Sequence, residues 1–178
     1  QGEMMKMMAS NIGNNNNTTN NTTNNNQRFN INVFLNEDCK NAINMSDFIK
    51  SIEVSLEQLD LTKTKGLEKG ITKVIMDNMN KLSLHERPLH CTDVKRETLY
   101  IKDNDKWEKD KDKEKIKHVI KRTQNKNYPA LIKWTEANPD FMEDDSKQIY
   151  YAKAMSKAGK PIEEVEDKII KNICKENY

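Results

Sequence analysis

The sequence predicts a mostly helical α+β fold, in which helices pack with a small antiparallel β-hairpin or sheet and a disordered Asn-rich linker precedes them. Three observations lead to this prediction. Apolar residues recur at three- and four-residue steps in several segments, as on amphipathic helices. Two short runs with β character lead into an Asp-Asn-Asp cluster at 103–105, which is typical of a hairpin turn. Residues 11–26 are almost wholly Asn and Thr and have nothing to bury.

These patterns divide the chain into three parts. Residues 1–10 are rich in Met and are predicted to end an upstream helix or coiled coil. Residues 11–27 form the predicted disordered linker, although an Asn-rich run can also self-associate as stacked β-structure. Residues 28–178 are predicted to form a single α+β domain. The chain begins with Gln1-Gly2 rather than Met, and we expect it to be a fragment or a processed form.

The domain is predicted to begin with a strand over 29–35. Apolar residues there alternate with Asn, interrupted only by Phe34, which is the period-two pattern of a half-buried strand. A helix capped by Ser46 is predicted to run to about Leu59, because apolar residues follow at helical spacing. The predicted elements after it are a helix over 66–82, a break over 83–88, strands over 89–93 and 97–102, a turn at 103–105 and a third short β segment at 106–108.

Helical segments are predicted for the rest of the chain. The first begins near Asp110 or Asp112, where acids suit the positive end of the helix dipole. The others cover 130–137, a segment capped near Asp144 that runs to Met155, and a last helix opened by Pro161. The last helix either docks on its own domain or pairs with another subunit. The sequence leaves open whether the helices after Asn127 pack on the hairpin or form a separate lobe.

Composition excludes several classes of function. The 178 residues are 35% hydrophobic, and no run approaches the roughly 18–20 apolar residues that span a bilayer, so we expect no membrane partner. The net charge of +2 gives no global signal for nucleic acid. Three widely spaced cysteines without a CxxC motif, and no secretory signal, indicate an intracellular protein with reduced thiols.

No catalytic, metal or cofactor site can be assembled from the sequence. His90 and Cys91 are adjacent, but neighbouring side chains on a strand point to opposite faces and would not converge on one ion. There is no Gly-rich phosphate loop. Acidic pairs such as Asp103 with Asp105 fit turns as well as they fit acid/base chemistry. We therefore expect a protein that is not an enzyme and that has no catalytic residue, metal, cofactor or small-molecule substrate.

Three segments resemble the C-terminal part of a family of proteins from giant nucleocytoplasmic large DNA viruses. They are residues 30–39 (NINVFLNEDC), 87–96 (RPLHCTDVKR) and 99–107 (LYIKDNDKW). The resemblance covers roughly Asn11 to Asn138. It implies that residues 1–10 are the end of a coiled coil and that a zinc finger lies outside this chain. It also implies an intracellular viral protein in the host cytoplasm or the viral factory. It implies no biochemical activity and supplies no catalytic residues.

The resulting functional prediction is a non-enzymatic viral interaction or oligomerisation module that self-associates. Its predicted contact residues lie in the first strand and the last helix: Phe29, Ile31, Val33, Leu35, Ile162, Val165, Ile169 and Ile173. On this prediction, the substitution Val33→Asp breaks assembly.

The alternative prediction is a DNA- or RNA-binding domain with a winged-helix-like arrangement. Residues 94–126 contain 12 Lys and Arg against 7 Asp and Glu, so the basic excess falls on the hairpin and the following helix, the elements with which a winged helix meets DNA. The residues predicted to contact nucleic acid are Lys95, Arg96, Lys102, Lys106, Trp107, Lys121 and Arg122.

Overall fold

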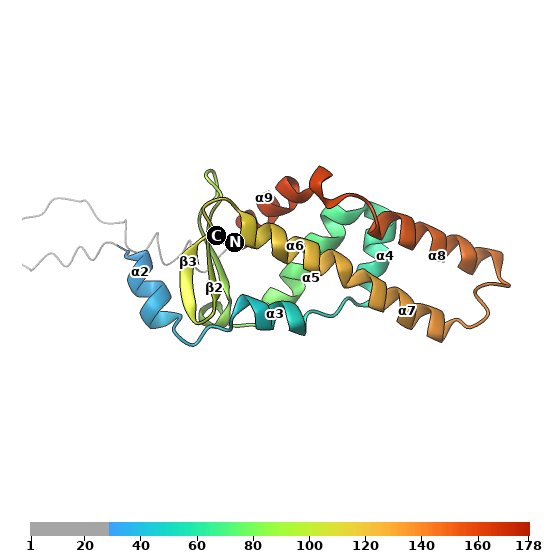
Figure 1. The fold of residues 1–178 in the computed structure, drawn as a ribbon, viewed down its shortest axis with the longest axis horizontal. Helices are drawn as coiled ribbons and strands as arrows, with labels where there is room; N and C mark the ends of the chain where they lie inside the picture. Colours follow the sequence, from blue (N-terminus) through green and yellow to red (C-terminus); the bar gives the residue numbers. More distant parts are fainter. Residues whose placement is uncertain (1–28) are drawn as a thin grey trace, which may run out of the picture.

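The computed structural model describes residues 29–178, and the predictions for residues 1–10 and 11–27 lie outside these residues. The described chain is elongated (Figure 1). A small sheet lies near one end, a hairpin of two helices projects at the other, and further helices pack between them. The elements are, in order, α2 (Ile31–Val33), η1 (Phe34–Asp38), α3 (Met45–Ser51), α4 (Leu56–Lys65), α5 (Leu67–Met79), η2 (Leu84–Glu86), β1 (Leu89–Asp93), β2 (Thr98–Asp103), β3 (Lys106–Lys109), α6 (Glu114–Asn125), α7 (Asn127–Ala137), α8 (Asp145–Ala158), η3 (Ile162–Glu164) and α9 (Glu166–Glu176).

The predicted α+β class is confirmed, with a three-stranded antiparallel sheet in the order β1-β2-β3. The β2–β3 turn is Asn104-Asp105, and both residues have positive φ, as a two-residue hairpin turn requires. Asn44, just before α3, is hydrogen bonded to this turn: its Oδ1 accepts from the Asp105 backbone N–H at 2.8 Å. The turn therefore also fixes the start of α3.

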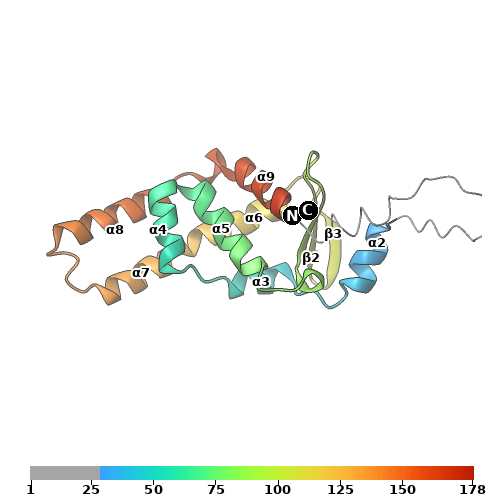
Figure 2. The ribbon, with the colours of Figure 1, turned by 180° about the vertical axis from the view of Figure 1, so that it is seen from behind.

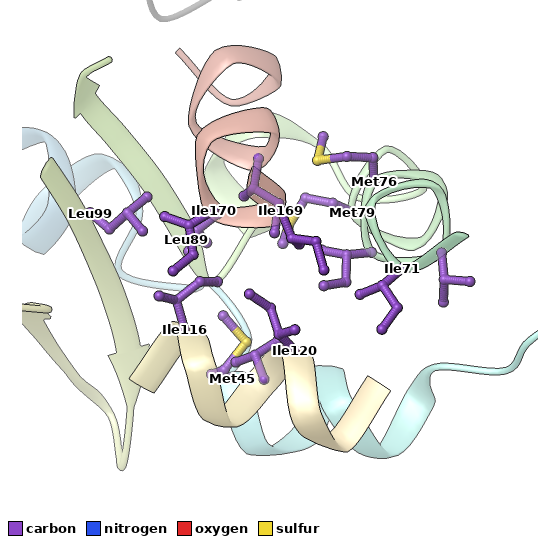
Figure 3. Close-up of a cluster of buried hydrophobic side chains, with 14 of the residues drawn as sticks. Met45, Ile71, Met76, Met79, Leu89, Leu99, Ile116, Ile120, Ile169 and Ile170 are labelled. Atoms are coloured by element: carbon purple, nitrogen blue, oxygen red, sulfur yellow. The ribbon is translucent and has the colours of Figure 1, made fainter. Parts of the chain in front are cut away.

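One face of the sheet forms the main core with the helices. Alternate residues of β1 and β2, such as Leu89 and Leu99, point from the sheet toward α5, α6 and α9. Figure 3 shows Ile116 and Ile120 of α6 meeting Leu89 and Ile169 in this core. Helix α5 lies in the middle of this packing, and nine of its 13 residues are buried. Its four residues that are not buried, Glu68, Lys69, Lys73 and Asp77, are all charged.

Residues 31–38 are helical, so the strand predicted over 29–35 is wrong. The Asn30 side chain accepts from the backbone N–H groups of Asn32 at 3.0 Å and Val33 at 3.4 Å, and so caps α2. A π-helical turn, η1, then brings the consecutive residues Phe34 and Leu35 onto the outer face of the sheet. Helix capping and burial of this adjacent pair outweigh the period-two pattern. We call residues 29–43 the arm.

The helix predicted over Ser46–Leu59 is split into α3 and α4. The backbone of Ile52 is extended while its side chain stays buried in the main core, so the apolar spacing continues across a break in the helix. Ser55 then opens α4 with a capping box, in which Ser55 and Gln58 each accept from the other's backbone N–H. A strong second cap explains why one long helix does not form.

Helices α4 and α5 approach each other closely at Gly70. A Cβ at this position would overlap the Thr62 hydroxyl and would lie 2.9 Å from Thr62 Cβ. The neighbouring Gly66 has φ +89°, which favours glycine, and lets the chain turn sharply from α4 into α5. The two glycines therefore define a tight helical corner on which the second lobe is built.

The helices after Asn127 divide between two places. Helices α7 and α8 pack on α4 in a separate lobe, whereas η3 and α9 return to the main core (Figure 2). The prediction that the last helix can dock on its own domain is confirmed. The helix that was predicted from Pro161 begins with the 3₁₀ turn η3, and α9 follows at Glu166.

Candidate interaction surface

The predicted contact residues of the last helix lie inside the chain's own core. Ile162, Ile169 and Ile173 are buried there. Leu35 of the arm is likewise buried against the sheet. These side chains have no surface to offer a second molecule, so this part of the predicted interface is wrong. The apolar stripe of α9 is used for intramolecular docking.

The other predicted contact residues are only partly available. Phe29 and Ile31 are half-buried and pack beside the sheet's outer face, and Val165 is half-buried beside the main core. Val33 is exposed on α2. One exposed apolar side chain on a three-residue helix is too small a surface for a stable interface.

Two of the residues predicted to bind nucleic acid are used to hold the arm. The Lys102 Nζ is buried and donates to the carbonyl oxygens of Lys40 at 2.9 Å and Ala42 at 2.7 Å. The Trp107 indole Nε1 donates to the carbonyl of Cys39 at 3.3 Å. Neither side chain is free to reach a phosphate or a base, so these two assignments are wrong.

The remaining basic residues, Lys95, Arg96, Lys106, Lys121 and Arg122, are exposed. Acidic partners offset part of the surrounding positive charge: Arg96 pairs with Asp93 at 3.3 Å, Lys115 pairs with Glu108 at 2.6 Å, and Lys113 pairs with Glu97. Several basic side chains of this region are therefore paired with acids, as is common on a solvated protein surface. Nucleic-acid binding stays a prediction, and fewer of the predicted side chains are available to contact nucleic acid.

A cysteine and a histidine distant in the sequence meet beneath the arm. Cys39 Sγ lies 3.6 Å from His90 Nε2, and both residues are buried. Burial raises the pKa of the Cys39 thiol to about 12 and lowers the pKa of His90 to about 4. At neutral pH the pair is thus a neutral thiol beside a neutral imidazole. It is not the thiolate that a nucleophile requires.

The other two cysteines, Cys91 of β1 and Cys174 of α9, are also buried in the main core. The contact with Cys91, together with burial, raises the pKa of the Cys174 thiol far above its ordinary value. This pair therefore packs as small apolar side chains. Within residues 29–178, no group of three His, Cys, Asp or Glu side chains is placed to hold a metal ion.

A groove of about 240 Å³ lies between α3, β2 and α6. Met45, Ile49 and Val119 are among its apolar lining residues, and Asp103 and His118 contribute polar groups. The Asp103 carboxylate accepts from the backbone N–H of Ser46 at 3.4 Å, which gives it a structural role at the start of α3. Ser46, Glu114 and Lys115 also line the groove, and we assign no chemical reaction to it.

Exposed apolar side chains gather instead on the α7–α8 hairpin. Seven large apolar residues are exposed among residues 29–178, and five of them lie between 128 and 155, less than a fifth of that stretch. Ile132 is 58% exposed and Ile149 is 55% exposed. We call these five residues together the hairpin face, although they point to more than one side of the hairpin: Tyr128, Ile132, Met142, Ile149 and Met155.

Aromatic side chains pack on the inner side of the hairpin, and this packing leaves other side chains on the outside. Trp134 of α7 stacks on Tyr150 of α8, with ring centroids 4.7 Å apart, and also contacts Phe141. Leu59 of α4 closes this cluster. Asp144 caps α8 by accepting from the Ser146 backbone N–H at 2.9 Å. With the aromatic residues turned inward, Ile132 and Ile149 are left on the outside.

Comparisons with known proteins add no relative to this geometry: no family model, curated protein or solved structure matches the chain. Within residues 29–178, none of the helices combines the length and apolar character that crossing a bilayer requires.

The sequence interpretation missed the hairpin face, although a signal for it is present. In α7, the core residues Leu131 and Trp134 share one side of the helix, and Ile132 falls on another side. In α8, Ala154 and Ala158 face inward while Ile149 and Met155 do not. An apolar residue off the core stripe of a helix is a signal that can be read from helical spacing.

Proposed function

We propose that this chain is a non-enzymatic protein-interaction module that self-associates through the hairpin face. The observation that carries the proposal is the gathering of five of the seven exposed large apolar residues on one helical hairpin. Single exposed apolar residues are common on proteins, but a local concentration of them marks interaction surfaces.

The position of the hairpin supports the same proposal. It projects from the end of the molecule opposite the sheet and the arm (Figure 1). A partner can therefore approach it without displacing the sheet or its contacts. The described chain begins beside α2, at the opposite end. Self-association through the hairpin would therefore leave the α2 end of each copy free.

The chemistry of the buried side chains supports the non-enzymatic part of the proposal. The one cysteine–histidine contact, between Cys39 and His90, is neutral and lies beneath the arm. Its pKa values are shifted away from those that a nucleophile and a base need at neutral pH. We assign no residue to catalysis.

The test is sedimentation equilibrium of the chain over about 1–200 μM, with Ile132→Glu and Ile149→Glu as variants. We expect the wild-type chain to exceed its 20.8 kDa monomer mass as concentration rises. Each variant is expected to stay monomeric, because burying an unpaired carboxylate costs several kcal/mol, about a thousandfold in affinity.

Val33→Asp is the matched control, since Val33 is an exposed apolar residue at the other end of the molecule. We expect this variant to associate like the wild-type chain. A wild-type chain that remains monomeric at every concentration overturns the proposal. Loss of association in Val33→Asp, with Ile132→Glu unaffected, moves the interface to the arm.

A further inference from the structure

Charge is distributed unevenly along the α7–α8 hairpin. The tip, residues 136–145, contains five acidic residues and no Lys or Arg. The C-terminal part of the hairpin, residues 153–160, contains three lysines and no acidic residue. The Tyr128 hydroxyl lies within 3.7 Å of the position of a Cβ on Gly159, so the start of α7 lies beside the end of α8. The hairpin therefore has an acidic end and a basic end.

Much of this charge has no partner within the described chain. Asp140 pairs with Lys147 at 2.6 Å, and this contact lowers the pKa of the Asp140 carboxyl. Among residues 29–178, by contrast, no oppositely charged group lies within 4.0 Å of Asp145 or Lys153. Both side chains are exposed and are available to a second molecule.

Asp145, Ile149 and Lys153 form one ridge on α8. They follow one another at four-residue intervals, and residues at this spacing are neighbours on the surface of a helix. The ridge thus carries an acid, an exposed apolar residue and a base, in that order. About 12 Å separate its two charged ends, at 1.5 Å of rise per residue.

This order of charges is self-complementary when the ridge is reversed. We propose that two copies of the chain pair through α8 in an antiparallel, two-fold arrangement, with Ile149 of each copy at the axis and Asp145 of each opposite Lys153 of the other. This inference rests on the proposed self-association and names its geometry. A two-fold interface uses the same patch on both copies. The ridge can serve as that patch because its charge order is complementary to its own reverse. A parallel pairing would instead set like charges against each other.

The test is a charge exchange between two variants, Asp145→Lys and Lys153→Glu, followed by sedimentation equilibrium. In Asp145→Lys, lysines face lysines in both symmetric contacts. In Lys153→Glu, acids face acids. We expect each variant alone to show a dissociation constant raised about tenfold or more, because two exposed ion pairs are replaced by two repulsive pairs. An equimolar mixture restores both pairs, and we expect its affinity to return to the wild-type value.

Lys168→Glu, an exposed charge change on α9, is the matched control and is expected to leave association unchanged. Circular dichroism establishes that each variant keeps its helices, since Asp145 also lies in the first turn of α8. A wild-type chain that never associates overturns the proposed function and this geometry together. A wild-type chain that associates, with both variants unaffected or with no recovery in the mixture, overturns the antiparallel geometry alone.

Discussion

His90 lies between the rings of Phe34 and Trp107, with centroid separations of 5.2 Å and 5.6 Å. Burial lowers its pKa from 6.5 to about 4. Between these pH values, the unfolded chain binds a proton at His90 that the folded chain does not bind. The stability that His90 contributes is therefore fully present above about pH 6.5, and it is lost as the pH falls toward 4, by an amount on the order of 3 kcal/mol.

The substitution His90→Phe tests this linkage. A phenyl ring keeps an aromatic group between the two neighbours but cannot bind a proton. We expect the free energy of unfolding of the variant to fall about 2 kcal/mol less than that of the wild type between pH 7 and pH 4.5, as measured by urea denaturation. His118→Gln, at an exposed position, is expected to keep the wild-type pH dependence. Equal pH dependence in His90→Phe and the wild type would contradict the buried, neutral state of His90.

The side-chain surroundings of His90 and Lys102 could not be predicted from the sequence. The adjacent residues His90 and Cys91 were correctly expected not to converge, because they lie on opposite faces of β1. The actual partner of His90 is Cys39, which is 51 positions away. Lysine is usually a surface residue, yet Lys102 is buried because the arm folds over it. Only the tertiary placement of the arm decides these two environments.

At the scale of elements, the arm is held to the sheet by one buried lysine and a small aromatic cluster. The Lys102 Nζ donates to the Lys40 and Ala42 carbonyl oxygens, and hydrogen bonds from a charged donor are the stronger kind. Phe34 and Leu35 add apolar contacts with the outer face of the sheet. The arm is thus a cover that protects the polar and aromatic side of β2 and β3.

We expect Lys102→Met to loosen the arm. The methionine side chain retains most of the apolar length but donates no hydrogen bonds, so two carbonyl oxygens lose their partner at a cost of about 1–3 kcal/mol. Hydrogen–deuterium exchange of residues 34–43 is expected to accelerate at least tenfold. Lys106→Met, an exposed neighbour in the sheet, is the control. If exchange in the arm is unchanged in Lys102→Met, the lysine does not hold it.

Elements with strong local signals were predicted well, and elements decided by tertiary packing were not. The strands β1 and β2 follow from their β-forming residues, and the β2–β3 turn follows from the Asp103-Asn104-Asp105 cluster. The alternation of apolar residues and Asn over 29–35 wrongly predicted a strand, because Asn30 caps a helix and Phe34 packs on the sheet. Periodicity alone did not separate α3 from α4, since Ile52 keeps its place in the core across the break.

At the scale of the whole molecule, the two ends of the described chain differ in their surfaces. The sheet end is closed by the arm and by intramolecular hydrogen bonds. The hairpin end keeps apolar side chains on its outer surface. Our proposal keeps the predicted module character and moves the contact elements to the hairpin, because Ile162, Ile169 and Ile173 are buried in the core. The last helix has the cleaner apolar stripe, and a clean stripe indicates a face that the domain itself buries.

The most direct test of the central claim is a dilution series of the ¹⁵N-labelled chain followed by NMR, because the amides that change on association identify the interface. We expect concentration-dependent shifts or broadening to be confined to α7, α8 and the loop between them, with the largest changes around Ile132 and Ile149. Unchanged amides in the sheet and arm complete the expected result. Spectra that do not change with concentration, or changes centred on the arm or on α9, would contradict self-association through the hairpin.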